Sequence, residues 1–204
     1  MVNKMTAYGV PFCESGIQKE DGGGSFVRVL QKRGENMLKT GDYVVHSMEG
    51  VCEVRDVVEM KKGREMVPYY QLCSWPDERT TVYVPVNQEN GRVRLRALLS
   101  RDEVREICLE LQQSEVEWVS DIGKRQEQML EILREGNPGR MARMTKMLMI
   151  KDLEKPLGSR DKSTLLTAQR VLFSEIAMAT GLDFQSVQRA VKQNLKDPGE
   201  PLPF

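Results

Sequence analysis

The sequence predicts an α+β protein in which an SH3- or Tudor-like antiparallel β-barrel is followed by an all-α helical bundle. Between residues 43 and 95 the apolar residues fall in short β-rich runs separated by turn residues. From Ser100 onward they recur at helical spacing, and the change coincides with a capping box, Ser100 to Glu103. A chain of 204 residues with 40% hydrophobic content is long enough for two such domains.

Residues 1–36 differ from the rest because they show no sustained periodicity and include the run Gly22 to Ser25. This pattern is typical of a disordered leader. Arg33-Gly34-Glu35 can also be encoded by purine-rich codons that resemble a bacterial ribosome-binding site just upstream of Met37. The leader is therefore either a flexible tail or not translated in vivo. A tryptic peptide from residues 1–33 in the native protein would decide for the tail.

The predicted barrel spans residues 37–98. Its strands are expected from Tyr43 onward and at residues 51–58, 69–73, 80–85 and 93–95. Turn residues separate them, among them Glu49-Gly50, Lys62-Gly63 and Trp75-Pro76. Five short strands at this spacing are typical of a small barrel.

The predicted helical domain spans residues 100–196 and contains about five helices. Ser114 to Glu117 matches a second capping box, which predicts that a helix carrying Trp118 begins there. Asn137 followed by Pro138 predicts a third helix start, and Asp183 is a candidate N-cap for the last helix. Residues 197–204 are expected to be a flexible tail.

Composition excludes several classes of function. His46 is the single histidine, which removes most Ser-His and Cys-His catalytic schemes and any multi-histidine metal site. The four cysteines are widely spaced and indicate reduced thiols in a cytoplasmic protein. No apolar run approaches the length of a membrane span. We therefore expect that the protein is not an enzyme and that it binds no metal, cofactor, small-molecule substrate or membrane.

The charges of the helical domain are unevenly distributed, although the chain as a whole has a formal net charge of zero. Residues 102–121 hold seven acids and one base, whereas residues 124–170 hold eleven bases and six acids. The basic stretch is either a phosphate-binding face or a solvated helix surface, and charge alone favours the solvated surface.

Several segments resemble the CarD/CdnL family of bacterial transcription regulators. The first is LKTGDYVVHSMEGVCEV at residues 38–54, followed by Lys62-Gly63, YQL at residues 70–72 and TVYVP at residues 81–85. The resemblance resumes with MLEILREG at residues 129–136 and DKSTLLTAQRVLFSEIA at residues 161–177. It covers residues 37–182, and the N-terminal module also occurs in the transcription-repair coupling factor.

The resemblance implies that the barrel docks on the β subunit of RNA polymerase through a strand edge, while the helical domain contacts promoter DNA at the upstream edge of the melted bubble. It also implies that the protein stabilises the open complex, and we expect the protein to be a monomer. The polymerase contacts implied are Val58, Glu59, Met60, Lys61, Val82, Tyr83 and Val84. The DNA contacts implied are a tryptophan wedge, Trp118, and the basic residues Lys124, Arg125, Arg140, Arg143, Lys146, Lys151 and Arg170.

This chain departs from the family pattern at two places. The family tryptophan precedes an arginine by three residues, which corresponds here to Ile122 and Arg125, whereas the tryptophan is Trp118. Trp118 is therefore either a DNA wedge or a core residue. Glu59 and Tyr83 stand where relatives often carry arginine. The alternative function is a protein-interaction adaptor that uses the barrel without binding DNA, which Ser163, Thr167 and Gln169 favour slightly because relatives are often basic there.

Overall fold

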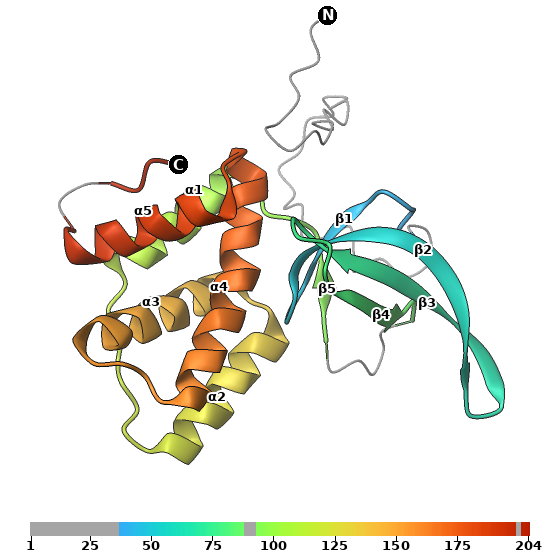
Figure 1. The fold of residues 1–204 in the computed structure, drawn as a ribbon, viewed down its shortest axis with the longest axis horizontal. Helices are drawn as coiled ribbons and strands as arrows, with labels where there is room; N and C mark the ends of the chain where they lie inside the picture. The colour runs from blue at the N-terminus through green and yellow to red at the C-terminus, as the bar shows by residue number, and fades with distance from the viewer. Residues whose placement is uncertain (1–36, 88–92, 199–200) are drawn as a thin grey trace, which may run out of the picture.

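A computed structural model describes residues 37–87, 93–198 and 201–204, and these form an antiparallel sheet followed by a bundle of helices (Figure 1). Its strands are β1 (Tyr43–His46), β2 (Gly50–Lys62), β3 (Glu65–Ser74), β4 (Thr81–Pro85) and β5 (Leu95–Arg96). The predicted α+β class is confirmed. The proposed leader, residues 1–36, lies outside the described residues.

The sheet is open, so the prediction of a barrel is wrong in this respect. The strand order is β4-β3-β2-β1-β5, and the edge strands β4 and β5 do not pair with each other in the described part of the chain. β5 has only two residues and pairs with β1 alone. β2 and β3 instead form a long hairpin that runs beyond β1 and away from the helices (Figure 1). A register shift between Val54 and Asp56 increases its twist.

The helices are α1 (Arg101–Gln113), α2 (Ile122–Glu135), α3 (Pro138–Glu154), α4 (Ser159–Thr180) and α5 (Phe184–Lys196), which confirms the expected number for the described residues. Three predicted helix starts are also confirmed. Ser100 and Glu103 form a reciprocal capping box at α1, and Asn137 and Asp183 cap α3 and α5 with their side chains.

The second predicted capping box is wrong. Ser114 is the C-cap of α1, and its hydroxyl donates to the carbonyl oxygen of Glu110. Residues 114–121 form an irregular segment, called here the connecting loop, and α2 begins only after Asp121. Trp118 therefore lies on a loop rather than on a helix.

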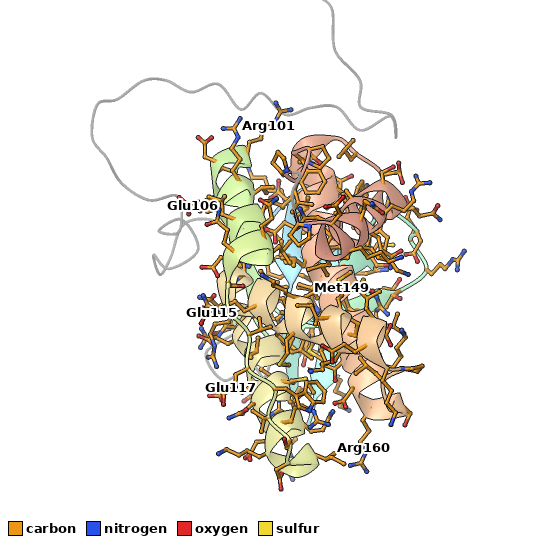
Figure 2. The ribbon with its side chains drawn as sticks, turned by 90° about the vertical axis from the view of Figure 1, so that its left-hand side faces the viewer. Arg101, Glu106, Glu115, Glu117, Met149 and Arg160 are labelled. Atoms are coloured by element: carbon orange, nitrogen blue, oxygen red, sulfur yellow. The ribbon has the colours of Figure 1, made fainter. Side chains whose placement is uncertain are left out.

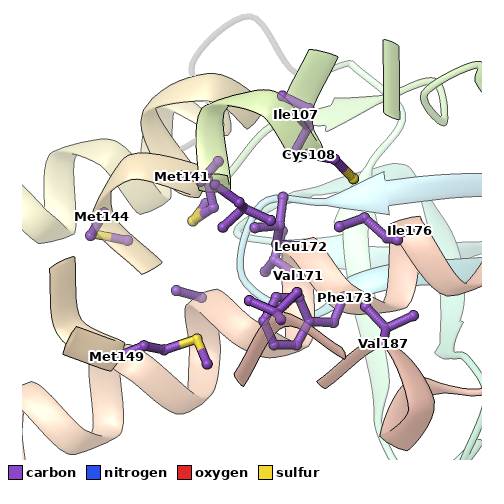
Figure 3. Close-up of a cluster of buried hydrophobic side chains, with 14 of the residues drawn as sticks. Ile107, Cys108, Met141, Met144, Met149, Val171, Leu172, Phe173, Ile176 and Val187 are labelled. Atoms are coloured by element: carbon purple, nitrogen blue, oxygen red, sulfur yellow. The ribbon is translucent and has the colours of Figure 1, made fainter. Parts of the chain in front are cut away.

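The main hydrophobic core joins all five helices and continues into the sheet. α4 lies between the other helices and the strands (Figure 1), and its buried Leu172, Phe173 and Ile176 occupy the centre of the core (Figure 3). Val45 of β1 and Val51 of β2 belong to the same cluster. Leu202, which is only 8% exposed, also belongs to this core, and Phe204 packs against it. A second, smaller cluster packs on the sheet around Leu72 and Val84.

The junction between the sheet and α4 is closely packed and polar. The hydroxyl of Ser174 accepts a hydrogen bond of 3.0 Å from the backbone N–H of Val51. Gly50 has a φ of +81°, and a Cβ there would lie 2.5 Å from the Ser174 hydroxyl and 2.9 Å from the Arg170 carbonyl oxygen. Only glycine satisfies both the backbone conformation and the close approach of the helix.

An ion pair with a fully buried carboxylate strengthens the same junction. Glu175 of α4 is 0% exposed and accepts two hydrogen bonds from the guanidinium of Arg96, at 2.5 and 2.6 Å. It also accepts the backbone N–H of Leu99 at 2.8 Å. The sheet and the helices are thus held together as one body.

Candidate functional site

The exposed edge of β4 is the first candidate interface. Ser74 N–H donates to the carbonyl oxygen of Thr80, and Val86 N–H donates to that of Pro68. Because hydrogen-bonded pairs alternate along an antiparallel ladder, the backbone groups of Val82 and Val84 point toward β3. Those of Thr81 and Tyr83 point away from the sheet and are available to an added strand.

One face of the sheet near this edge carries an apolar patch. The strand register places Val58 beside Tyr69 and Pro85, and Met60 beside Val67, on the same side as Tyr83. Met60 is 38% exposed and Tyr83 is 47% exposed, and neither belongs to a core cluster. We call the set the sheet patch; its members are Val58, Met60, Val67, Tyr69, Tyr83 and Pro85.

The residues predicted to contact a protein partner therefore divide between two faces. Val58, Met60 and Tyr83 lie on the sheet patch, whereas Glu59, Lys61, Val82 and Val84 point to the opposite side. Val84 is buried and Val82 packs on the smaller core cluster. Val67, Tyr69 and Pro85 were missed by the sequence prediction, because only the strand register reveals that they face the same way.

Arg125, predicted as a phosphate contact, lies inside the protein. It is 5% exposed, and its guanidinium donates to both carboxylate oxygens of Asp161, at 3.2 and 2.9 Å. It also donates to the carbonyl oxygens of Val119 at 2.5 Å and Ser120 at 3.3 Å. These bonds fix the connecting loop against α2 and α4, and they leave no exposed guanidinium for DNA.

Lys146 is also placed inside. It is 8% exposed, and its ammonium donates to the carbonyl oxygens of Gln112 and Ser114, both at 2.8 Å. Burial lowers the pKa of this ammonium, while the charge of Glu110 acts in the opposite direction. Lys146 thus satisfies the carbonyl groups at the C-terminal end of α1.

Trp118 is partly buried against the main core. The Arg125 guanidinium carbon lies 4.1 Å from the indole ring centroid, and the Lys151 ammonium lies 6.0 Å from it. Both cations are within the range of a cation–π interaction. The indole is therefore a structural support of the connecting loop, and its ring is not freely exposed.

Beside Trp118 lies a positively charged end of the helical bundle, called here the basic end. Asp161 in the first turn of α4 accepts hydrogen bonds from Arg125 and Gln126 of α2, which brings the N-termini of these two helices together. The basic side chains of this end are Lys124, Lys151, Lys155, Arg160 and Lys162. Among the described residues, Lys124, Lys155 and Arg160 form no ion pair, whereas Lys151 pairs with Glu154 and Lys162 with Asp152.

The basic end also has an apolar tip and an open helix terminus. Ile122, the first residue of α2, is 59% exposed. The N-cap of α4 is Gly158, which supplies no side-chain hydrogen bond to the first N–H groups of that helix. Figure 2 shows Arg160 at the opposite end of the helical domain from Arg101. The sequence prediction missed Lys155 and Arg160. The signal that could have identified them is Gly158, which lies between them and cannot cap a helix with a side chain.

The remaining predicted DNA contacts do not lie on the basic end. Arg140 pairs with Glu135, and Arg143 pairs with Glu110 at 3.0 Å. Arg170 pairs with Glu49 at 2.7 Å, which places it at the junction between α4 and the turn that joins β1 to β2. Of the predicted set, the structure brings together Trp118, Lys124 and Lys151, with Arg125 beneath them.

The described residues contain no group of three or more His, Cys, Asp or Glu side chains that could hold a metal ion. Within the same residues, no helix is long and apolar enough to cross a membrane.

Two family models match the chain in the order of its two structural parts. The CarD-like/TRCF RID domain matches residues 38–97, and the CarD C-terminal domain matches residues 106–192. The chain belongs to the CarD family. It is therefore a transcription-related protein of a type that interacts with RNA polymerase, and its family consists of transcription factors rather than enzymes. No curated protein matched the chain at a significant level.

Proposed function

We propose that this CarD-family protein binds the β subunit of RNA polymerase and promoter DNA at the upstream edge of the bubble, and thereby stabilises the open complex. The protein would act as a monomer in the bacterial cytoplasm. The basic end carries the proposal, because it combines unpaired cations, the N-terminus of α4 without a side-chain cap and an exposed apolar side chain. The cations and the helix N-terminus suit DNA phosphates, and the apolar side chain suits insertion at an unstacked base step.

The polymerase contact in this proposal is made by the edge of β4 together with the sheet patch. The N–H and C=O groups of Thr81 and Tyr83 pair with a strand of the partner, and this backbone pairing does not require arginine side chains. The exposed Met60 and Tyr83 then supply apolar contact area beside the new strand.

The DNA contact in this proposal is made by Lys124, Lys151, Lys155 and Arg160, with Ile122 as the apolar side chain that enters the minor groove. Isoleucine is among the residues that such proteins insert between base steps. Trp118 holds the loop beside it, and Arg125 holds Trp118. The protein favours the open complex only to the extent that it binds the melted form more tightly than the closed form.

The second candidate is a protein-interaction adaptor that does not bind DNA. The ion pairs of Arg140, Arg143 and Arg170 favour it, because they neutralise three of the basic residues expected to contact phosphates.

Salt-dependent binding to a promoter-length duplex separates the two functions. Alanine at Lys124 and Arg160 should weaken binding to all sequences alike and lower the salt slope by about one unit for each cation removed from a phosphate. The matched control is alanine at Lys39 and Lys62, which removes two exposed lysines of the N-terminal sheet part rather than of the helices. Equal salt slopes for the two double variants would favour the adaptor.

The apolar contact is tested by the lifetime of the open promoter complex. Ile122→Ala should shorten this lifetime by an amount equivalent to about 1–3 kcal/mol while leaving the melting temperature unchanged. Trp118→Ala should lower the melting temperature, because the indole packs on the core and on Arg125. If Trp118→Ala leaves the melting temperature unchanged but shortens the lifetime of the open complex, Trp118 rather than Ile122 is the residue that inserts into the DNA.

A further inference from the structure

A groove of about 250 Å³ lies between the connecting loop, α2 and α3. Its apolar lining comes from Val116, Val119, Met129, Ile132, Met144 and Met147. Met129 and Met144 are nearly buried, whereas the loop residues and Met147 are partly exposed. Three methionines give this lining an adaptable shape, since their side chains are unbranched and polarizable.

The charges around the groove are unbalanced in favour of the acids. Arg125, Arg140 and Arg143 line it, but each is already paired with a carboxylate: Asp161, Glu135 and Glu110 respectively. Glu115 and Glu117 also line it, and neither forms an ion pair with any described residue. Figure 2 shows both glutamates on the same side of the molecule as Glu106 of α1. The free charge at the groove is therefore negative.

These features define the kind of partner that fits. Negative free charge disfavours DNA at this site, because the cations are neutralised and the glutamates repel phosphate. The volume is below the roughly 300–1,000 Å³ of sites for drug-sized ligands, so the groove accommodates one or two side chains of a longer segment.

We infer that the groove docks a segment of a protein partner in which an aliphatic or methionine side chain is flanked by lysine or arginine. The apolar side chain enters between Met129, Met144 and Met147, and the flanking cations pair with Glu115 and Glu117. None of the residues of the β4 edge or of the basic end lines this groove, although it adjoins the basic end through Arg125 and the connecting loop. The inference therefore does not depend on the proposed function.

The test uses the full chain with 13C-labelled methionine methyl groups, and Met→Leu variants assign the signals. The probe is a short helical peptide of leucine and lysine, and the control probe is a peptide of leucine and glutamate. The leucine–lysine peptide should shift the signals of Met144 and Met147. It should leave Met149 unchanged, because Met149 lies on α3 but does not line the groove (Figure 3).

Glu115→Gln with Glu117→Gln should weaken binding of this peptide about tenfold, as expected for two charges that pair with the ligand. Both side chains are exposed, so the variant should fold normally. The matched control, Glu65→Gln with Glu106→Gln, changes the net charge equally on exposed residues that do not line the groove. Equal weakening by the two variants would show nonspecific charge attraction and overturn the inference.

Three other outcomes would also overturn it. Duplex DNA could shift the Met144 and Met147 signals while the leucine–lysine peptide does not, which would make the groove a nucleic-acid surface. The signals could shift with protein concentration alone, which would make it an interface between two copies of this chain. The leucine–glutamate peptide could bind as well as the leucine–lysine peptide, which would show that the glutamates do not select the partner.

Discussion

Arg125 illustrates how burial decides the role of a charged residue. Its guanidinium is held by Asp161 and by two carbonyl oxygens of the connecting loop, and it covers the ring of Trp118. The neighbouring Lys124 belongs to the same helical turn but is exposed. Two adjacent cations thus have different environments, one buried in an ion pair and one exposed to solvent.

Replacing Arg125 with methionine should lower the free energy of unfolding by about 3–5 kcal/mol, because Asp161 then becomes an unpaired buried charge. Lys124→Met is the matched control and should change the free energy of unfolding by no more than about 0.5 kcal/mol, since the Lys124 side chain is exposed. Urea denaturation of both variants provides the measurement. Similar losses in the two variants would contradict the structural role of Arg125.

His46 is a second residue whose environment sets its chemistry. It is 5% exposed, and its Nδ1 accepts hydrogen bonds from the backbone N–H groups of Met48 at 3.2 Å and Glu49 at 3.0 Å. Burial lowers the pKa of this imidazole below its usual 6.5, although the charge of Glu49 opposes the shift. Protonation would also replace the acceptor at Nδ1 with a donor.

Stability should therefore decrease as the pH falls below 6.5, because the unfolded state takes up a proton that the folded state excludes. His46→Asn retains an acceptor oxygen but cannot titrate, so this part of the pH dependence should disappear. The measurement is the difference in free energy of unfolding between wild type and variant from neutral to mildly acidic pH. His46 is the only histidine, so no other imidazole contributes. A difference that does not change with pH would exclude the shift.

At the scale of elements, proline substitutions in β4 can distinguish the loss of a hydrogen bond within the sheet from the loss of a donor to an added strand. Val82 donates its N–H into the sheet, whereas the N–H of Thr81 points outward. Thr81→Pro should therefore weaken binding to the polymerase β subunit sharply without a large change in melting temperature, because edge strands tolerate proline at outward positions. Pro85 already occupies such a position.

The control variants are Val82→Pro and Thr81→Ala. Val82→Pro should lower the melting temperature, because it removes a hydrogen bond to β3. Thr81→Ala should bind like wild type, because it keeps the backbone N–H. Pull-down with the β subunit and a melting curve are measured for each variant. Unimpaired binding by a folded Thr81→Pro would place the docking site elsewhere.

The sequence predicted elements well where the signal was local. Ser100, Asn137 and Asp183 cap helices as expected, since a cap depends on residues within one turn. Ser114 to Glu117 matches the capping-box pattern but begins no helix, because the carbonyl groups of Val119 and Ser120 bond to Arg125 rather than to a helix. Tertiary contacts overrode the local preference there.

The roles of the cations could not be predicted, because they depend on residues distant in sequence. Asp161, which pairs with Arg125, is separated from it by 36 residues. The carbonyl oxygens that hold Lys146 are separated from it by 34 and 32 residues. The sequence therefore identified a basic stretch at residues 124–170 but not which of its members are buried.

At the scale of the whole molecule, the sheet and the helices should unfold together. They share the main core through Val45 and Val51, and Arg96 and Glu175 pair across the junction. Calorimetry should show one cooperative transition for the wild-type protein. Arg96→Met should lower the free energy of unfolding by about 3–5 kcal/mol, because Glu175 then remains buried without its partner.

Arg105→Met is the comparison for this prediction. Arg105 pairs with Asp102 on the exposed surface of α1, and such pairs contribute about 1 kcal/mol or less. Two separate transitions in the wild-type protein would show that the junction does not couple the two parts. The sequence did not reveal this coupling, because Arg96 and Glu175 are 79 residues apart.

The rigid junction has a consequence for the strength of binding. In a protein that holds polymerase through β4 and DNA through the basic end, the second contact forms within a complex that already exists. A stiff connection keeps the basic end at a high effective concentration near the DNA, whereas a flexible one would spread it over a larger volume. Weak affinity for isolated duplex is thus compatible with tight binding at a promoter. The close fit of Gly50 against α4 keeps the connection stiff, so in such a protein it would contribute to avidity without contacting either partner.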